Sequence, residues 1–285
     1  MPLATMKKLL TDAARENRAC GAFSVGNMEM VRGAIRAAEA EHTPIILQIA
    51  QVRLKASPLE LMAPMMLAAA RHAQVEVAVH LDHGLTMEMI QQALEAGFTS
   101  VMLDASRQPF AENVRLTKEV AARAAAYGAT VEAEFGLVGG SEDGKGGQGV
   151  RCTDPAQAAE FVSLTGIDAL AVAIGNAHGD YPAAPHLAFN VLEQIQRNTD
   201  IPLVLHGGSG ISDIDFQHAI SLGIRKVNIA TASFHAAADA AAGSLNGKER
   251  PDYFALSEAM TEGVCRNVAR HIRVFNTPYS PTKTA

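Results

Sequence analysis

Three histidines in this sequence share one setting, because each precedes a glycine where a short apolar run ends. They are His83 before Gly84, His178 before Gly179 and His206 before Gly207. A single histidine in such a place is more often an ordinary core or surface residue. Three at corresponding strand ends indicate a bound metal, and three histidines that leave a fourth position open are typical of catalytic zinc.

Carboxylates lie close to these histidines along the chain. Asp82 directly precedes His83, while Asp104 and Glu134 lie near the ends of two other apolar runs. A carboxylate beside a metal ligand can act as a general acid/base, or it can orient the histidine from behind. The sequence leaves both interpretations of Asp82 open.

The elements that must position these residues alternate along the chain. The predicted strands are residues 21–26, 44–50, 75–83, 100–106, 130–136, 169–175, 202–207 and 226–231. Ala-rich stretches of helical period lie between them, among them 86–96, 110–127, 154–164 and 212–221. Several strands are almost continuously apolar, as burial on both faces requires. This alternation indicates an α/β protein with a parallel sheet.

Eight such units predict a closed (β/α)8 TIM barrel, which commonly forms from ~250 residues as one domain. The alternative is an open doubly wound sheet, but the first strand–helix turn lacks the G-x-G-x-x-G pattern of dinucleotide-binding folds. Active-site residues of barrels lie at the C-terminal ends of the strands. The barrel therefore predicts that the three histidines and Asp82 meet at one mouth.

Two segments interrupt the alternation. Residues 136–150 include GLVGGSEDGKGGQG, and so many glycines predict a mobile loop over the barrel mouth. A C-terminal extension begins at Gly243, with a helix predicted over 253–274. We expect one domain, in which the barrel covers residues 1–242 and the extension covers 243–285.

The composition is that of a globular protein with a large core, since 48% of the residues are hydrophobic and 19% are charged. A net charge of -6 disfavours nucleic acid and anionic membranes as partners, because both bind basic patches. No segment approaches the ~20 apolar residues that span a bilayer. We expect a cytoplasmic protein that binds a small molecule and whose three cysteines are free thiols.

Seven segments resemble those of class II fructose- and tagatose-bisphosphate aldolases, in the same order and over almost the whole chain. They are VHLDHG (79–84), VMLDAS (101–106), VEAEFG (131–136), GGSEDG (139–144), AIGNAHG (173–179), LVLHGGSG (203–210) and KVNIAT (226–231). The resemblance implies a zinc-dependent aldolase that reversibly cleaves a ketose 1-phosphate or ketose bisphosphate to dihydroxyacetone phosphate and an aldehyde. It also implies that His83, His178 and His206 bind the Zn²⁺ ion.

The same resemblance assigns the proton carriers. Asp82 would act on the C4 hydroxyl of the ketose, and Glu142, in the glycine-rich loop, would act at C3. The chemistry agrees, because cleavage leaves an enediolate that a metal stabilises as a Lewis acid while carboxylates move the protons. A base on a mobile loop can arrive after the substrate and exclude water. The alternative for Glu142 is solvated charge on an exposed loop.

Glycine-rich turns that enter helices suit phosphate, because their N–H groups are exposed and the helix dipole favours anions. Two such turns follow the last two predicted strands: Gly207-Gly208-Ser209 and Ala230-Thr231. These turns predict the phosphate site.

Further contacts come from the resemblance alone. It adds Asn228 as a hydrogen-bond partner of the enediolate, and a monovalent cation (Na⁺ or K⁺) near Gly179 and Gly207. Asp104 and Glu134 would lie near the metal, either behind its ligands or as an alternative metal position. Glu132 and His80 are expected to support the site, with core hydrogen bonding as the open alternative.

Other functions fit parts of the pattern. A Schiff-base aldolase needs a desolvated lysine at the mouth, whereas Lys226 is expected to open the eighth strand at the opposite end. A zinc hydrolase could use the same histidines on the same barrel. A noncatalytic companion subunit of an aldolase would have no physical need for them.

The sequence departs from fructose-bisphosphate aldolases on the aldehyde side of the predicted site. Ala50 stands where their Q-x-S serine helps to hold the second phosphate, and Ala230 stands where one subgroup has aspartate and tagatose-type enzymes have alanine. Ser24 replaces a usual asparagine, although Asn27 still matches. We therefore predict that the aldehyde need not carry a phosphate and could be a sugar acid. The extension resembles a family segment that reaches a neighbouring active site, which implies a homodimer or homotetramer.

Overall fold

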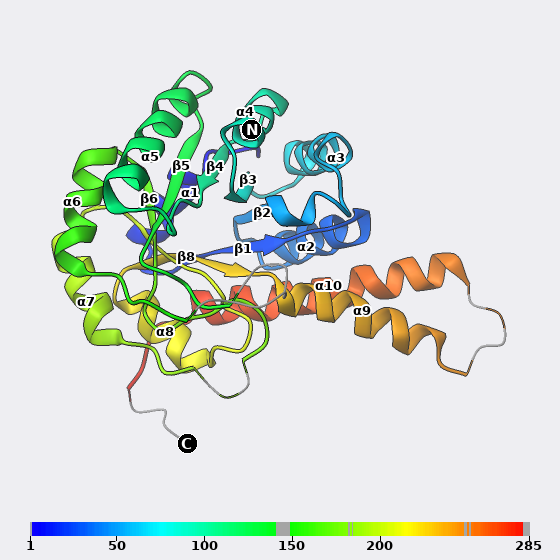
Figure 1. The fold of residues 1–285 in the computed structure, drawn as a ribbon. Helices are drawn as coiled ribbons and strands as arrows, with labels where there is room; N and C mark the ends of the chain where they lie inside the picture. Colours follow the sequence, from blue (N-terminus) through cyan, green and yellow to red (C-terminus); the bar gives the residue numbers. More distant parts are fainter. Residues whose placement is uncertain are drawn as a thin grey trace.

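A computed structural model describes residues 2–140, 149–181, 183, 185–247, 250 and 252–281. Within these ranges, eight parallel strands close into a barrel that helices surround (Figure 1). Each strand pairs with its neighbours in sequence, and the eighth closes on the first. The predicted (β/α)8 barrel is therefore confirmed.

The strands are short and buried. They are β1 (Cys20–Ser24), β2 (Ile45–Ala50), β3 (Val77–Gly84), β4 (Ser100–Leu103), β5 (Thr130–Phe135), β6 (Ala169–Val172), β7 (Leu203–Leu205) and β8 (Ile224–Ile229). Each predicted run overlaps one of them. Several runs, such as 169–175, extend past the observed strand, because their last residues already belong to the loops that carry the site.

The helices lie outside the barrel or close its lower end, which is the end where the strands begin. They are α1 (Met6–Arg15), α2 (Met28–Ala40), α3 (Leu59–His72), α4 (Met87–Ala96), α5 (Phe110–Ala125), α6 (Pro155–Thr165), α7 (Phe189–Asn198), α8 (Asp213–Ser221), α9 (Thr231–Leu245) and α10 (Tyr253–Asn276), with a 3-10 turn η1 (Gln51–Arg53). Thr86, Asp154 and Ser212 cap α4, α6 and α8 through their side-chain oxygens. None of the described helices is both long and apolar enough to cross a membrane.

The barrel interior changes from apolar to polar along its axis. The lower layer packs against α1 and includes Ala22, Ile46, Ala78, Met102, Ala171 and Val204. Towards the C-terminal ends of the strands the buried residues become polar, among them Gln48, His80, Glu132, His206, Lys226 and Asn228. Buried polar groups need hydrogen-bond partners, so this upper layer must form a connected network.

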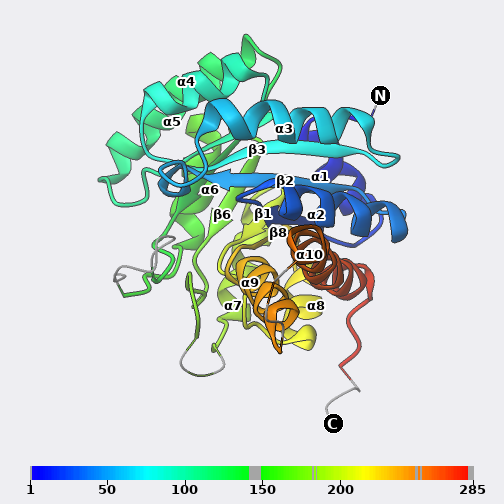
Figure 2. The same ribbon diagram turned by 90° about the vertical axis from the view of Figure 1, so that its right-hand side faces the viewer.

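A helical pair projects from the barrel. α9 runs outward and α10 returns along it, extending beyond the ring of helices (Figures 1 and 2). α10 packs on both α9 and α2, and a Cβ at Gly33 of α2 would lie only 2.5 Å from the Thr261 carbonyl oxygen. Gly243, the predicted start of the C-terminal extension, lies inside α9. At the start of α10, Tyr253 and Phe254 are 68% and 80% exposed.

Candidate active site

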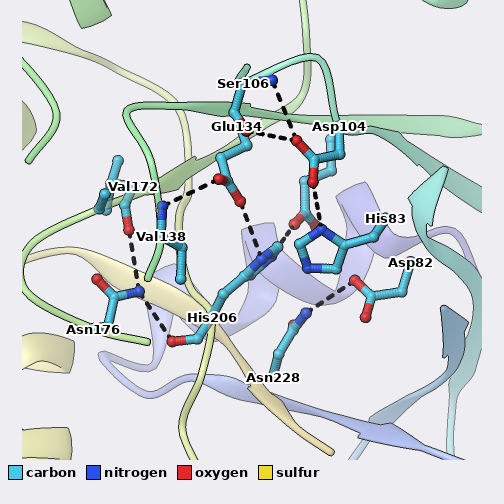
Figure 3. A network of polar contacts seen from close by, with 12 residues as sticks. Asp82, His83, Asp104, Ser106, Glu134, Val138, Val172, Asn176, His206 and Asn228 are labelled. Atoms are coloured by element: carbon cyan, nitrogen blue, oxygen red, sulfur yellow. Dashed lines mark hydrogen bonds and ion pairs between the residues drawn. The ribbon is translucent and has the colours of Figure 1, made fainter. Parts of the chain in front are cut away.

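Asp82 and His83 both face the site although they are consecutive residues of β3 (Figure 3). Neighbouring residues of a regular strand point to opposite faces. Here the pairing of β3 with β4 shifts register between Leu81 and Gly84, and His83 has a positive φ of 41°. Such a bulge re-aims a side chain, and a left-handed histidine is a strained conformation of the kind that occurs at functional sites. The bulge thus brings two chemical groups to the mouth from one strand.

The three sequence-predicted histidines come together at this mouth. One ligand atom from each lies within 4.8 Å of the other two. The His83 ring centroid is 4.8 Å from that of His178 and 4.7 Å from that of His206. Burial, reinforced by repulsion from the other two histidines, lowers the pKa of His178 well below its ordinary value. His178 is therefore neutral near pH 7, the form that can bind a metal.

Carboxylates orient two of the rings, and Figure 3 shows the first of them, Asp104, beside His83. Asp104 Oδ2 lies 2.9 Å from His83 Nδ1, and the Ser106 hydroxyl donates to the other Asp104 oxygen at 2.7 Å. Glu132 Oε1 lies 2.8 Å from His206 Nε2. Contacts of this kind fix the tautomer, so they direct His83 Nε2 and His206 Nδ1 towards the common centre.

The donor set fits a zinc ion. His206 Nδ1 and Glu134 Oε2 are buried and form no hydrogen bond within the described residues, although they lie 3.4 Å apart. Burial by itself would lower the pKa of His206, but the adjacent Glu132 and Glu134 carboxylates raise it to about 9, because they favour positive charge on the ring. Such atoms suit a cation that three imidazoles also reach. A second group, His83 with Asp104 and Glu134, meets the same 4.8 Å limit and corresponds to the alternative metal position.

Amide donors hold the Asp82 carboxylate beside the histidines. Asn228 Nδ2 donates to Asp82 Oδ1 at 3.0 Å, and Gln48 Nε2 donates to Oδ2 at 3.2 Å. Gln48 Nε2 also lies 3.2 Å from the hydroxyl of Ser24, one of the departures in the sequence. The structure therefore brings together Asp82 and Asn228, two residues that the sequence analysis assigned to the reaction.

The two glycine-rich turns lie against each other. Ser209 Oγ accepts a hydrogen bond from the N–H of Ala232 at the start of α9 (2.9 Å), and the Gly208 N–H donates to the Asn228 carbonyl (3.1 Å). The Gly208 N–H is thus engaged inside the protein. The N-cap of α9, Ala230, supplies no side-chain acceptor, so the helix end formed by Ala230 and Thr231 retains its attraction for anions.

The remaining predicted residues have varied settings. Asn27 caps α2, because its Oδ1 accepts from the Met30 N–H at 2.9 Å. Ala50 pairs with Asp82 in the β2–β3 register, and Gly179 follows His178 with a φ of 87°. Glu142 lies outside the described residues. A substrate role for Asn27 and a catalytic role for Glu142 stay predictions.

Two polar residues that the sequence analysis missed connect the loops after β6 and β7. Asn176 Nδ2 donates to the His206 carbonyl at 3.0 Å, as Figure 3 shows. The Tyr181 hydroxyl donates to the Gly207 carbonyl at 2.9 Å and accepts from the Ala177 N–H at 2.7 Å. Asn176 lies within the AIGNAHG motif and could have been found there, whereas nothing in the local sequence marks Tyr181.

Lys226 differs from its predicted placement. β8 begins at Ile224, so Lys226 is its third residue rather than its first, and its side chain is fully buried in the barrel. Its Nζ forms an ion pair with Glu132 Oε2 (2.9 Å) and donates to Asn228 Oδ1 (2.7 Å). The expectation that this lysine opens the strand, remote from the site, is wrong. Its ion pair with Glu132 gives no support to a Schiff-base role.

A closed parallel barrel with three convergent histidines and a carboxylate at its mouth defines a metal-dependent enzyme site. The chain matches the family described as "Fructose-bisphosphate aldolase class-II" over residues 4–278. It is 45% identical over 234 residues to the fructose-bisphosphate aldolase of Geobacillus stearothermophilus (81% of this chain, 82% of the relative). It is 40% identical over 281 residues to that of Staphylococcus aureus strain Mu50 (97% and 98%).

A solved structure gives the same result. The crystal structure of the YdjI aldolase from Escherichia coli K12 superposes with a TM-score of 0.86 at 38% identity, covering 96% of this chain and 97% of that one. The chain therefore belongs to the class II fructose-bisphosphate aldolase family. It is an aldehyde-lyase, and aldolases of this class depend on zinc.

Proposed function

We propose that this aldolase reversibly cleaves a ketose phosphate to dihydroxyacetone phosphate and an aldehyde, with Zn²⁺ held by His83, His178 and His206. The convergence of these three imidazoles beside Asp82 carries the proposal. The names of the two fructose-bisphosphate aldolase relatives support a sugar-phosphate substrate. When bound, zinc supplies a Lewis acid that stabilises negative charge on the substrate carbonyl oxygen.

Side chains of the site move the protons. Asp82 accepts the C4 hydroxyl proton during cleavage and returns it during condensation. The amides of Gln48 and Asn228 keep its carboxylate in place, and the Asn228 amide also donates to the enediolate. Glu142 is proposed to move the proton at C3.

The ketose phosphate is proposed to bind between the two glycine-rich turns. Its ligands are the backbone N–H groups of the turn 207–209 other than that of Gly208, and those of Ala230 and Thr231 at the start of α9. The contact between Ser209 and Ala232 supports this arrangement, because it joins the two turns into one surface. A monovalent cation near Gly179 and Gly207 belongs to the same proposal.

Metal removal tests the zinc role. Chelation should abolish cleavage and added zinc or cobalt should restore it, whereas borohydride with substrate should trap nothing on a lysine. Each single variant in which alanine replaces His83, His178 or His206 should lose most of its zinc affinity. Full activity after verified metal removal would exclude this mechanism, and a water-dependent cleavage without aldol chemistry would favour a hydrolase.

The proton carriers should behave differently from the ligands. An Asp82→Ala variant should retain zinc and lose cleavage, and a Glu142→Ala variant should slow exchange of the C3 proton of dihydroxyacetone phosphate with solvent. Unchanged exchange in the second variant would assign the base elsewhere.

The aldehyde is proposed not to need a phosphate. Ala50 is buried at the level of Asp82 and has no hydroxyl, and the Ser24 hydroxyl is engaged with Gln48. A hydrogen bond to a charged group contributes about 1.5–3 kcal/mol, so bisphosphates should react roughly 10- to 100-fold less well than the true substrate. The test is kcat/KM for fructose and tagatose bisphosphates beside ketose 1-phosphates, including sugar-acid derivatives. A bisphosphate that exceeds every monophosphate would contradict the proposal.

A homodimer or homotetramer is proposed for the assembly, with a cytoplasmic location. Tyr253 and Phe254 begin α10 with most of their surface exposed, on a helical pair that projects from the barrel. Exposed aromatic side chains are enriched at protein interfaces. Light scattering of the wild type and of a Tyr253→Ser/Phe254→Ser variant tests this, and a monomeric wild type at micromolar concentration would refute it.

A further inference from the structure

The upper barrel layer contains a lysine for which the proposed reaction has no direct use. Lys226 on β8 and Glu132 on β5 are both 0% exposed, and Lys226 Nζ lies 2.9 Å from Glu132 Oε2. The same Nζ donates to Asn228 Oδ1 at 2.7 Å. A buried ammonium is highly unfavourable unless it is paired, so these two contacts determine where it lies. Each contact leads to a different part of the site.

The first contact orients the Asn228 amide. An asparagine amide has a donor end and an acceptor end of nearly the same shape, so its neighbours decide which way it points. Lys226 can only donate, which requires Asn228 Oδ1 to face it. Nδ2 then faces Asp82 Oδ1 at 3.0 Å. The opposite orientation would place N–H against the ammonium and oxygen against the carboxylate, so Lys226 selects the orientation that donates to Asp82.

The second contact orients a histidine. Glu132 meets Lys226 through Oε2 and His206 Nε2 through Oε1, at 2.9 Å and 2.8 Å. With one oxygen fixed by the ion pair, the other is held as an acceptor for the Nε2 hydrogen of His206. This directs His206 Nδ1 to the centre that His83 and His178 share. Lys226 is thus connected to the proposed metal site through one intermediate residue, Glu132.

From these contacts we infer that Lys226 is a positioning residue for both halves of the reaction centre. Its contact with Asn228 fixes the orientation of the amide that donates to Asp82, the residue proposed to move the C4 hydroxyl proton. Its contact with Glu132 fixes the orientation of the His206 ring. Lys226 itself touches neither substrate nor metal in this role. The inference rests on the roles proposed above for Asp82, Asn228 and His206.

The test must separate the orienting role of Lys226 from its role as the counterion of Glu132. A Lys226→Met variant should unfold at a lower temperature, because Glu132 would be buried without a counterion. The double variant Lys226→Met/Glu132→Gln removes both charges, and its glutamine oxygen can still accept from His206 Nε2. It should keep wild-type thermal stability and stoichiometric zinc. Its kcat for ketose phosphate cleavage should nevertheless fall about 10- to 100-fold at a nearly unchanged KM, because the Asn228 amide is no longer held.

A second comparison tests whether the fall in kcat depends on Asn228. In an Asn228→Ala background, the same two changes should lower kcat by less than about threefold, since the group that they orient is gone. Wild-type cleavage in the double variant, or the full additional loss in the Asn228→Ala background, would each overturn the inference. Failure of the zinc-loaded wild type to cleave any ketose phosphate would instead refute the proposed function.

Discussion

Removal of the Asp104 carboxylate should weaken zinc binding without altering any histidine. Asp104 Oδ2 lies 2.9 Å from His83 Nδ1. Burial alone would raise the pKa of Asp104, but hydrogen bonds from His83 and Ser106 hold it well below its usual range, so the carboxylate is charged. A hydrogen bond to a charged group contributes about 1.5–3 kcal/mol, and about 1.4 kcal/mol corresponds to tenfold. The zinc Kd of Asp104→Ala should therefore rise about 10- to 150-fold.

Competition with a chromophoric chelator at neutral pH measures this Kd directly. Ser106→Ala is the matched control, because it removes the 2.7 Å contact from the Ser106 hydroxyl to Asp104 but leaves the contact between Asp104 and His83. Its Kd should change by less than about fivefold. A Kd for Asp104→Ala within about threefold of wild type would show that Asp104 does not orient His83 for the metal.

The other predictions concern the phosphate turn, helix packing and acid stability. Gly207→Ala should lower kcat/KM while zinc is retained, because a Cβ there would lie 2.0 Å from the Ala177 carbonyl oxygen at a φ of 64°; normal kinetics would exclude a tight fit at this turn. Gly33→Ala should lower the free energy of unfolding in urea by about 1–3 kcal/mol through its clash with Thr261, whereas Gly243→Ala, in open space within α9, should not lower it. Burial lowers the pKa of His271 to about 4, against 6.5 when unfolded, so its contribution to stability is present above pH 6.5 and is lost as the pH falls towards 4. A plot of unfolding free energy against pH should therefore be shallower for His271→Leu by up to about 1.4 kcal/mol per pH unit in that window, and parallel curves would contradict the assignment.

Much of the fold could be predicted from the sequence because a parallel barrel imposes a regular pattern. Strands buried on both faces must be apolar, and the helices between them carry capping residues such as Thr86 and Ser212. Strand ends were harder to predict, since the apolar run of β6 continues into a loop that is equally buried.

The site was predictable where chemistry and strand position coincide. His83, His178 and His206 are polar residues at the C-terminal ends of apolar runs, and that position alone brings them to one edge. Lys226 could not be placed in the same way, because a lysine in the middle of a strand gives no indication of which partners neutralise it. The hydrogen bond from Tyr181 to Gly207 could not be predicted either, since it depends on loop geometry rather than on residue spacing.

The irregular third strand limits where this chemistry could be transplanted. An engineer who copied Asp82 and His83 onto an idealised barrel would obtain one of them at the mouth and the other among the outer helices, since an even pleat alternates its side chains. The register shift between Leu81 and Gly84 would have to be grafted as well, together with the open space that Gly84 leaves beside the Met102 carbonyl oxygen. Candidate scaffolds should therefore be ranked by a matching irregularity in this strand before overall backbone similarity is considered.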